Sequence, residues 1–272
     1  MIFRRYHNVL INIGGTVYKA LITDLDGSAI PIASNGSDID DATRAAVKKA
    51  ISMGCKIACA TGRTWSHAEP IVNGLGIISP CIIEGGTRIV DVAKGRTLWE
   101  QALEAGSAAA VLDIFRNAQP KGFVLWSANQ LGQGLPLAAI TTVPHGVRFM
   151  YLIGVEPAVA AVVAQLVESR RLGITHSTPA WAGNGRIDLQ VTHPAATKRH
   201  ALEVWHDIEG ITPAETIGLG DSDNDRPLFE AVALKIAPEN ASSELKGLAD
   251  VIAPDVNQQA LKFVIETYLL AS

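Results

Sequence analysis

The stretch ALITDLDGSAI, residues 20–30, places two carboxylates, Asp24 and Asp26, directly after a short apolar run. Taken alone, Asp-x-Asp-Gly fits a strand that ends in a solvated turn, because Asp and Gly are common turn residues. It also fits a pair of catalytic carboxylates at the carboxyl end of a central parallel strand, where open α/β sheets bind their ligands. The rest of the chain decides between these interpretations.

The composition is that of an ordinary globular protein. The chain has 272 residues, of which 48% are hydrophobic and 18% charged, with a formal net charge of −4. This length is enough for one or two domains with a sizeable core. No basic patch indicates a nucleic-acid partner, and no apolar run reaches the roughly 18 residues that span a bilayer. We therefore expect no nucleic-acid partner and no membrane partner.

The three cysteines, Cys55, Cys59 and Cys81, show no metal-binding or disulfide spacing. A low and odd number favours a reducing compartment, and we interpret Cys55 and Cys59 as small core residues. Residues 1–16 lack a small-residue cleavage site and make a poor signal peptide. We treat them as an N-terminal extension of unassigned role and expect a cytoplasmic protein.

Apolar strands and helices alternate at both ends of the chain. The first part predicts strands over 17–23, 55–61 and 81–86, with a helix over 41–52. Such spacing is typical of right-handed βαβ units and a parallel sheet. The late part predicts a helix over 197–210, a strand entering an acidic loop over 215–225, strands at ALKIA and DVIAP, and a closing helix, QQALKFVIETYLL.

The regular alternation of predicted strands and helices is interrupted between residues 87 and 186. This part predicts a hairpin around Lys94-Gly95, helices near 104–117 and 156–170, and several short strands. We therefore predict an α/β protein. Its doubly wound, Rossmann-like parallel-sheet core comprises residues 17–86 and 187–272, and an inserted α+β cap domain comprises residues 87–186.

Four local features stand at predicted strand ends or helix starts: Asp24-Leu25-Asp26-Gly27, Thr61-Gly62-Arg63, Lys198, and the loop GDSDND at 220–225. In this order and spacing the chain resembles the haloacid dehalogenase (HAD) superfamily of phosphohydrolases over about residues 17–270. Within it the chain is similar to the Cof-type branch with a large C2-type cap. The motifs DLDG, ATGR and GDSDND are specific in combination, and the acidic loop is the strongest single match.

The resemblance implies a role for each motif. Asp24 would attack phosphorus and form an aspartyl-phosphate, and Asp26 would act as acid and then base. A phosphomonoester dianion facing a carboxylate needs a divalent cation, and Mg²⁺ prefers oxygen ligands. The implied catalytic residues are Asp24, Asp26, Thr61 and Lys198. The implied substrate-binding residues are Thr61, Gly62, Arg63, Lys198 and Asn224, and the implied Mg²⁺ ligands are Asp24, Asp26 (through its backbone carbonyl), Asp221 and Asp225.

Several positions depart from the family pattern or leave alternatives open. Ser28 stands where Thr is more usual, and IEGG at 83–86 replaces the commoner Asn-Gly, so that Glu84 is expected to alter the substrate pocket. Arg63 is either a phosphate or substrate contact or one half of a surface ion pair. We interpret Asp223 as a solvated loop residue. The cap residues proposed for substrate contact are Arg148, Asn184 and Arg186.

The resemblance predicts a Mg²⁺-dependent phosphatase acting on a small phosphorylated metabolite, such as a sugar phosphate or a phosphoglycolate-like compound. A phosphotransferase or sugar-phosphate mutase on the same fold stays open, because the motifs do not separate transfer to water from transfer to a hydroxyl. A non-catalytic phosphate-binding regulator is a further alternative, although a receiver domain of about 120 residues is much smaller than this chain. We expect a monomer or a homodimer.

Overall fold

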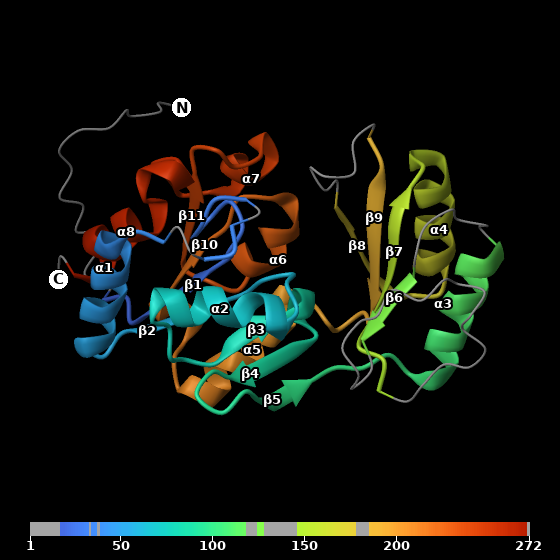
Figure 1. The fold of residues 1–272 in the computed structure, drawn as a ribbon, viewed down its shortest axis with the longest axis horizontal. Helices are drawn as coiled ribbons and strands as arrows, with labels where there is room; N and C mark the ends of the chain where they lie inside the picture. The colour runs from blue at the N-terminus through green and yellow to red at the C-terminus, as the bar shows by residue number, and fades with distance from the viewer. Residues whose placement is uncertain are drawn as a thin grey trace.

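A five-stranded parallel sheet lies at the centre of the larger of two lobes (Figure 1). The computed structural model describes residues 17–32, 34–36, 39–117, 124–127, 146–177 and 185–270. The predicted extension, residues 1–16, lies outside the described residues. The strand order is β12-β11-β10-β1-β2. The bounds are β1 (Ala20–Thr23), β2 (Lys56–Cys59), β10 (Thr216–Leu219), β11 (Leu234–Pro238) and β12 (Val251–Ala253).

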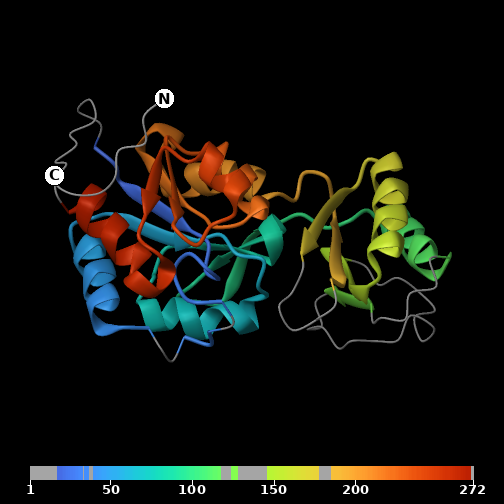
Figure 2. The same cartoon turned by 90° about the horizontal axis from the view of Figure 1, so that it is seen from above.

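Helices cover both faces of this sheet (Figure 2). Helix α1 (Asp41–Ser52) contacts α2 (Trp65–Leu75) and α8 (Ala260–Val264), whereas α6 (Arg226–Phe229) contacts α5 (Lys198–Glu209) and α7 (Ser243–Leu248). A π-helical turn, Ile265–Leu269, continues α8. The Asp40 side chain caps α1 by accepting from the amide of Thr43, as expected for the helix predicted over 41–52. The predicted doubly wound core is confirmed.

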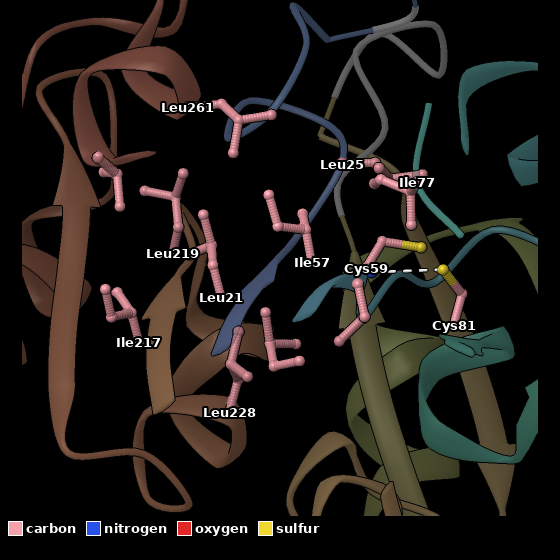
Figure 3. Packing of buried hydrophobic residues seen from close by; sticks show 14 of the residues in the cluster. Leu21, Leu25, Ile57, Cys59, Ile77, Cys81, Ile217, Leu219, Leu228 and Leu261 are labelled. Atoms are coloured by element: carbon pink, nitrogen blue, oxygen red, sulfur yellow. Dashed lines mark hydrogen bonds between the residues drawn. The ribbon is translucent and has the colours of Figure 1, made fainter. Parts of the chain in front are cut away.

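The core sheet is buried on both faces, as the continuous apolar strands predict. Leu21, Ile57 and Leu219 come from three neighbouring strands and are fully buried, and Figure 3 shows their side chains packed beside one another. The same view shows the sulfur atoms of Cys59 and Cys81 facing each other, and the backbone amide of Cys59 donates to the Cys81 sulfur at 3.4 Å. Both cysteines are fully buried thiols.

An antiparallel meander extends the core beyond β2. Strand β3 (Cys81–Ile83) lies beside the end of β2 through the bridge between Ala60 and Ile82, and β4 (Arg88–Asp91) and β5 (Arg96–Glu100) follow as a hairpin. Its turn is at the predicted position, with Gly95 in the left-handed region. Buried residues of β4 join the same hydrophobic cluster as the central sheet. The hairpin therefore packs with the core.

The smaller lobe is a four-stranded antiparallel sheet with the order β6-β7-β9-β8. Its strands are β6 (Val124–Ser127), β7 (Phe149–Val155), β8 (Gly173–Ser177) and β9 (Ile187–Thr192), and helices α3 (Ala105–Asn117) and α4 (Pro157–Ser169) pack on one face (Figure 1). A separate hydrophobic cluster, from Leu103 to Val191, fills the space between sheet and helices.

The packing differs from the predicted domain limits at both junctions. Strand β9 was expected to open the second core segment, but Leu189 and Val191 belong to the cluster of the smaller lobe. Its sequence, IDLQVT, places the apolar residues Leu189 and Val191 in the cluster beneath the helices, and the alternate polar residues Asp188, Gln190 and Thr192 are buried as well. By packing, we propose core segments of about 17–100 and 193–270, with a cap of about 103–192. Among the described residues, no helix is long and apolar enough to cross a bilayer.

Candidate active site

Three chain segments bring a lysine and a group of carboxylates together at the carboxyl edge of the parallel sheet. Asp24 follows β1, Asp221 and Asp225 follow β10, and Lys198 is the first residue of α5. The Lys198 ammonium donates to Asp24 Oδ1 at 2.8 Å and to Asp225 Oδ1 at 2.5 Å. The Lys198 side chain is 3% exposed. Strand ends that are neighbours in the sheet explain this juxtaposition.

The carboxylates of Asp24, Asp221 and Asp225 form an acidic cluster, in which one oxygen atom from each residue lies within 4.8 Å of the other two. The second oxygen of Asp225 accepts from the amides of Asp221, at 3.0 Å, and Ser222, at 3.2 Å. Since Lys198 holds the first oxygen, Asp225 shapes the loop and orients the lysine. Asp24 and Asp221 are therefore the better placed of the three to coordinate a cation directly.

Two small residues support Asp221 from the β1 side. The Ser28 hydroxyl donates to Asp221 Oδ1 at 3.1 Å, so the serine supplies the hydroxyl despite its departure from the usual Thr. Gly27 has a φ of 78°, and a Cβ atom there would lie 2.4 Å from Asp221 Oδ2. Only glycine allows both the left-handed backbone and this close approach. Asn240, which the sequence gave no reason to select, donates to the Gly27 carbonyl at 2.8 Å.

The acidic cluster holds more negative charge than Lys198 balances. Burial raises the pKa of Asp24 to about 8, with Asp225 and Asp221 raising it and Lys198 lowering it. Burial also raises the pKa of Asp221 to about 6, reinforced by Asp225. Burial opposes the charge of Lys198, yet Asp225 and Asp24 raise its pKa. Buried carboxylate oxygens with excess negative charge fit a hard divalent cation such as Mg²⁺.

We expect the metal-free protein to lose stability as pH rises from about 4 to about 8. Aspartate titrates near 3.8 when unfolded, whereas in the folded protein Asp24 titrates near 8 and Asp221 near 6. The folded state therefore binds more protons in this window, and the free energy of unfolding falls with pH. Mg²⁺ binding to the ionised carboxylates should offset this loss.

Thermal unfolding with EDTA or with Mg²⁺, at pH 5, 6.5 and 8, measures the effect. The rise in Tm on adding Mg²⁺ should be largest at pH 8 and should shrink strongly in Asp221→Asn. The exposed Asp41→Asn is the matched control and should keep the wild-type response. An Mg²⁺ effect of equal size at the three pH values would contradict the expectation.

Asp26 is held apart from the acidic cluster by Arg63. The Arg63 guanidinium donates to Asp26 through Nε, at 2.7 Å, and through Nη2, at 2.5 Å, and Nη2 also donates to the Ser34 carbonyl at 2.8 Å. The two side chains are 20% and 32% exposed. The structure shows the ion pair of Arg63, whereas its contact with phosphate or substrate stays a prediction. The metal contact expected from the Asp26 carbonyl stays a prediction.

Thr61 lies at the end of β2 and is 1% exposed. Its hydroxyl accepts from the amide of Arg63 at 3.1 Å, and its own amide donates to the Ile82 carbonyl at 3.0 Å. Thr64, and not Thr61, is the N-cap residue of α2. Gly62 lies between them, and a Cβ atom there would meet nothing within 4 Å. The loop is thus fixed at the site edge by β2 and β3.

The remaining predicted contact residues are not joined to the acidic cluster. Asn224 accepts from the Ser222 hydroxyl at 2.9 Å, and exposed Asp223 accepts from the Ser242 hydroxyl at 2.7 Å. In the cap, Arg148 is buried against Glu84, and Arg186 donates to the Gly154 carbonyl at 2.6 Å. These arginines therefore serve ion pairs and backbone contacts. Asn184 lies outside the described residues.

Comparison with known proteins identifies the family. The family profile described as haloacid dehalogenase-like hydrolase matches residues 21–132 and 166–265. The chain belongs to this family. The resemblance seen in the motifs is confirmed.

Characterised relatives match over most of their length. The chain is 26% identical to the 5-amino-6-(5-phospho-D-ribitylamino)uracil phosphatase YwtE of Bacillus subtilis, covering 92% of this chain and 98% of that protein. It is also 26% identical to a phosphoglycolate phosphatase of Methanopyrus kandleri, covering 89% and 93%. The predicted enzyme class, a phosphoric monoester hydrolase, is confirmed at this level.

Solved structures share the fold. The HAD-superfamily phosphatase BT1666 from Bacteroides thetaiotaomicron superposes with a TM-score of 0.76 at 19% identity, covering 98% of this chain and 100% of that one. SMU.1108c from Streptococcus mutans gives a TM-score of 0.76 at 18% identity, covering 94% and 100%. At this identity the likeness shows the fold, a parallel core with an additional antiparallel lobe.

Proposed function

We propose that the protein is a Mg²⁺-dependent phosphatase that hydrolyses a small phosphorylated metabolite through an aspartyl-phosphate on Asp24. One observation carries the proposal: a buried carboxylate at the end of the central strand contacts a buried lysine and lies within an acidic cluster. This arrangement offers a nucleophile, a cation for the phosphoryl group and oxygen ligands for a metal. Asp24, Asp221 and the Asp26 carbonyl would hold Mg²⁺, which when bound supplies positive charge against a phosphate dianion.

Hydrolysis proceeds by two displacements at phosphorus, and different residues of the chain carry out different parts of them. Asp24 attacks phosphorus, while Lys198 and the Thr61 hydroxyl carry the charge that develops on the phosphoryl oxygens. Asp26 gives a proton to the leaving oxygen and then takes one from the attacking water. Because the Arg63 guanidinium donates to both oxygens of Asp26, one of the two hydrogen bonds has to open before that oxygen can carry a proton, while the other keeps the carboxyl oriented.

The relatives support the substrate class. One acts on a phosphorylated ribityl compound and another on phosphoglycolate, as their names state. We therefore propose a sugar phosphate or a phosphoglycolate-like compound for this chain. Hydrolysis is favoured over phosphotransfer or mutase activity because the matched relatives are phosphatases. The predicted cytoplasmic location and the monomeric or homodimeric state stay predictions.

A panel of sugar phosphates, phosphoglycolate and para-nitrophenyl phosphate, assayed for phosphate release with Mg²⁺ and with EDTA, tests the proposal. We expect release from at least one natural compound, reduced at least 100-fold by EDTA and restored by added Mg²⁺. Product analysis by phosphorus NMR separates free phosphate from a transferred phosphoryl group. No release from any compound, by folded protein whose Tm rises with Mg²⁺, would refute the phosphatase.

A further inference from the structure

The short turn after β3, residues 84–86, has an unusual backbone. Glu84, Gly85 and Gly86 have φ values of 56°, 73° and 105°. The left-handed region is ordinary for glycine, but it is uncommon and costly for a glutamate. The Glu84 side chain is nevertheless 3% exposed, so it is held in this conformation inside the protein. Its contacts explain why.

On the core side, the turn holds the loop that carries Thr61 and Arg63. The amide of Glu84 donates to the Arg63 carbonyl at 2.9 Å, and the amide of Gly85 donates to the Thr61 carbonyl at 3.0 Å. Gly86 packs so closely on the start of α5 that a Cβ atom would lie 2.3 Å from the Thr197 carbonyl carbon. The turn therefore fixes both the Thr61 loop and the helix end that presents Lys198.

On the cap side, the same residue receives two side chains from the second lobe. Arg148, just before β7, donates to Glu84 Oε2 at 2.6 Å and to Oε1 at 3.3 Å. Gln190 of β9 donates to the Glu84 carbonyl at 3.2 Å and accepts from the Tyr151 hydroxyl at 3.1 Å. Glu84 thus joins cap strands to site loops directly.

We propose that Glu84 is a positioning residue that couples the docked cap to the Thr61–Arg63 loop. Without the contacts of Arg148 and Gln190, Glu84 keeps its core-side partners Thr87 and Arg88 but loses those from the cap. The left-handed turn and the loop that orients Asp26 through Arg63 then become freer to move. The kinetic consequence rests on the proposed function, whereas the coupling itself does not. Turnover should therefore depend on a cap arginine whose shortest contact is with Glu84.

The test compares Arg148→Gln, Glu84→Gln and the double variant with the wild type. Arg186→Gln is the matched control, because it breaks an Arg–Glu pair that lies within the cap. Amide hydrogen exchange should be at least tenfold faster at Glu84, Gly85 and residues 61–63 in Arg148→Gln and unchanged in Arg186→Gln. Amides of β11 report global opening and should stay protected in both.

Kinetics supply the second measurement. Arg148→Gln should lower kcat at least tenfold on an alkyl phosphate, whose leaving group needs the proton of Asp26, and much less on para-nitrophenyl phosphate, whose leaving group departs without one. The double variant should regain thermal stability relative to Arg148→Gln, because the buried Glu84 carboxylate that this single variant leaves without Arg148 is then removed. Its kcat on the alkyl phosphate should stay low.

The outcomes separate the two proposals. Faster exchange at residues 61–63 together with no hydrolysis by the wild type would uphold the coupling and refute the phosphatase. Exchange that is unchanged there in Arg148→Gln, or equally fast in Arg186→Gln, would overturn the role of Glu84 whatever the activity. A loss of kcat that is equal for both leaving groups would also count against it.

Discussion

Replacing Asp24 by Asn should reduce phosphate release by about four orders of magnitude or more, because the amide cannot attack phosphorus and removing a nucleophile removes the covalent route. The same change should raise the Tm of the metal-free protein at pH 8. Asp24 is buried, and its pKa of about 8 means that its ionised form is unfavourable in the folded state. Loss of activity with a gain in stability is a combination that misfolding does not produce.

Phosphate-release assays and thermal scans on the same preparation measure both effects. Asp223→Asn is the matched control, since Asp223 is exposed in the acidic loop and its carboxylate accepts from the Ser242 hydroxyl, outside the acidic cluster. It should keep activity within a few-fold. Mass spectrometry of quenched wild-type reactions should show a phosphorylated peptide containing Asp24. Activity in Asp24→Asn within tenfold of the wild type would refute the nucleophile assignment.

Among single changes in the site, replacing Lys198 by Met should lower the free energy of unfolding most. It leaves Asp24 and Asp225 buried without their common cation, and breaking a buried pair from one side costs about 3–5 kcal/mol. Activity should fall by about three orders of magnitude, because the charge that faces the phosphoryl group is lost. The destabilisation should grow with pH, because Asp24, whose pKa is raised by burial, then ionises without a cation beside it.

Urea unfolding at pH 5 and pH 8 and the phosphate-release assay measure these effects. Lys19→Met is the control, because Lys19 forms an exposed ion pair with Glu215 and such pairs contribute about 1 kcal/mol or less. Lys198→Arg should not restore activity, since the longer planar head does not fit the space of the ammonium. A Lys198→Met variant as stable as Lys19→Met at pH 8 would contradict the buried pairing.

The catalytic side of the fold was predictable because it depends on local signals. Apolar runs that end in Asp24, Thr61 and the acidic loop mark strand ends, and parallel strands bring such ends to one edge of the sheet. The helix predicted over 41–52 has those bounds in the structure. Lys198 is implied by the family resemblance rather than by a local signal, and it does contact Asp24.

The sequence pattern does not show which side chains far apart in the sequence contact each other in the fold. Nothing local in Arg63 distinguishes a partner for Asp26 from a ligand for phosphate, since a guanidinium fits both carboxylate and phosphate. Glu84 and Arg148 were interpreted as residues of the substrate pocket, yet they neutralise each other in the interior. For β9 a signal does exist, since apolar and polar residues alternate in IDLQVT, yet the predicted second core segment begins at residue 187 and includes it.

The central strand obtains its two neighbours at very different times during synthesis. Strand β2 follows β1 closely, whereas β10, which pairs Ala20 with Thr216, emerges only after the whole second lobe has been made. At ribosomal rates this leaves one edge of β1 unpaired for roughly 10 to 40 seconds, a span in which an exposed edge invites wrong pairing. The hydrogen bond between Lys198 and Asp24, 174 positions apart, likewise requires a residue that is made after the second lobe. The catalytic site of the nascent chain is therefore completed late, when most of the chain has left the ribosome.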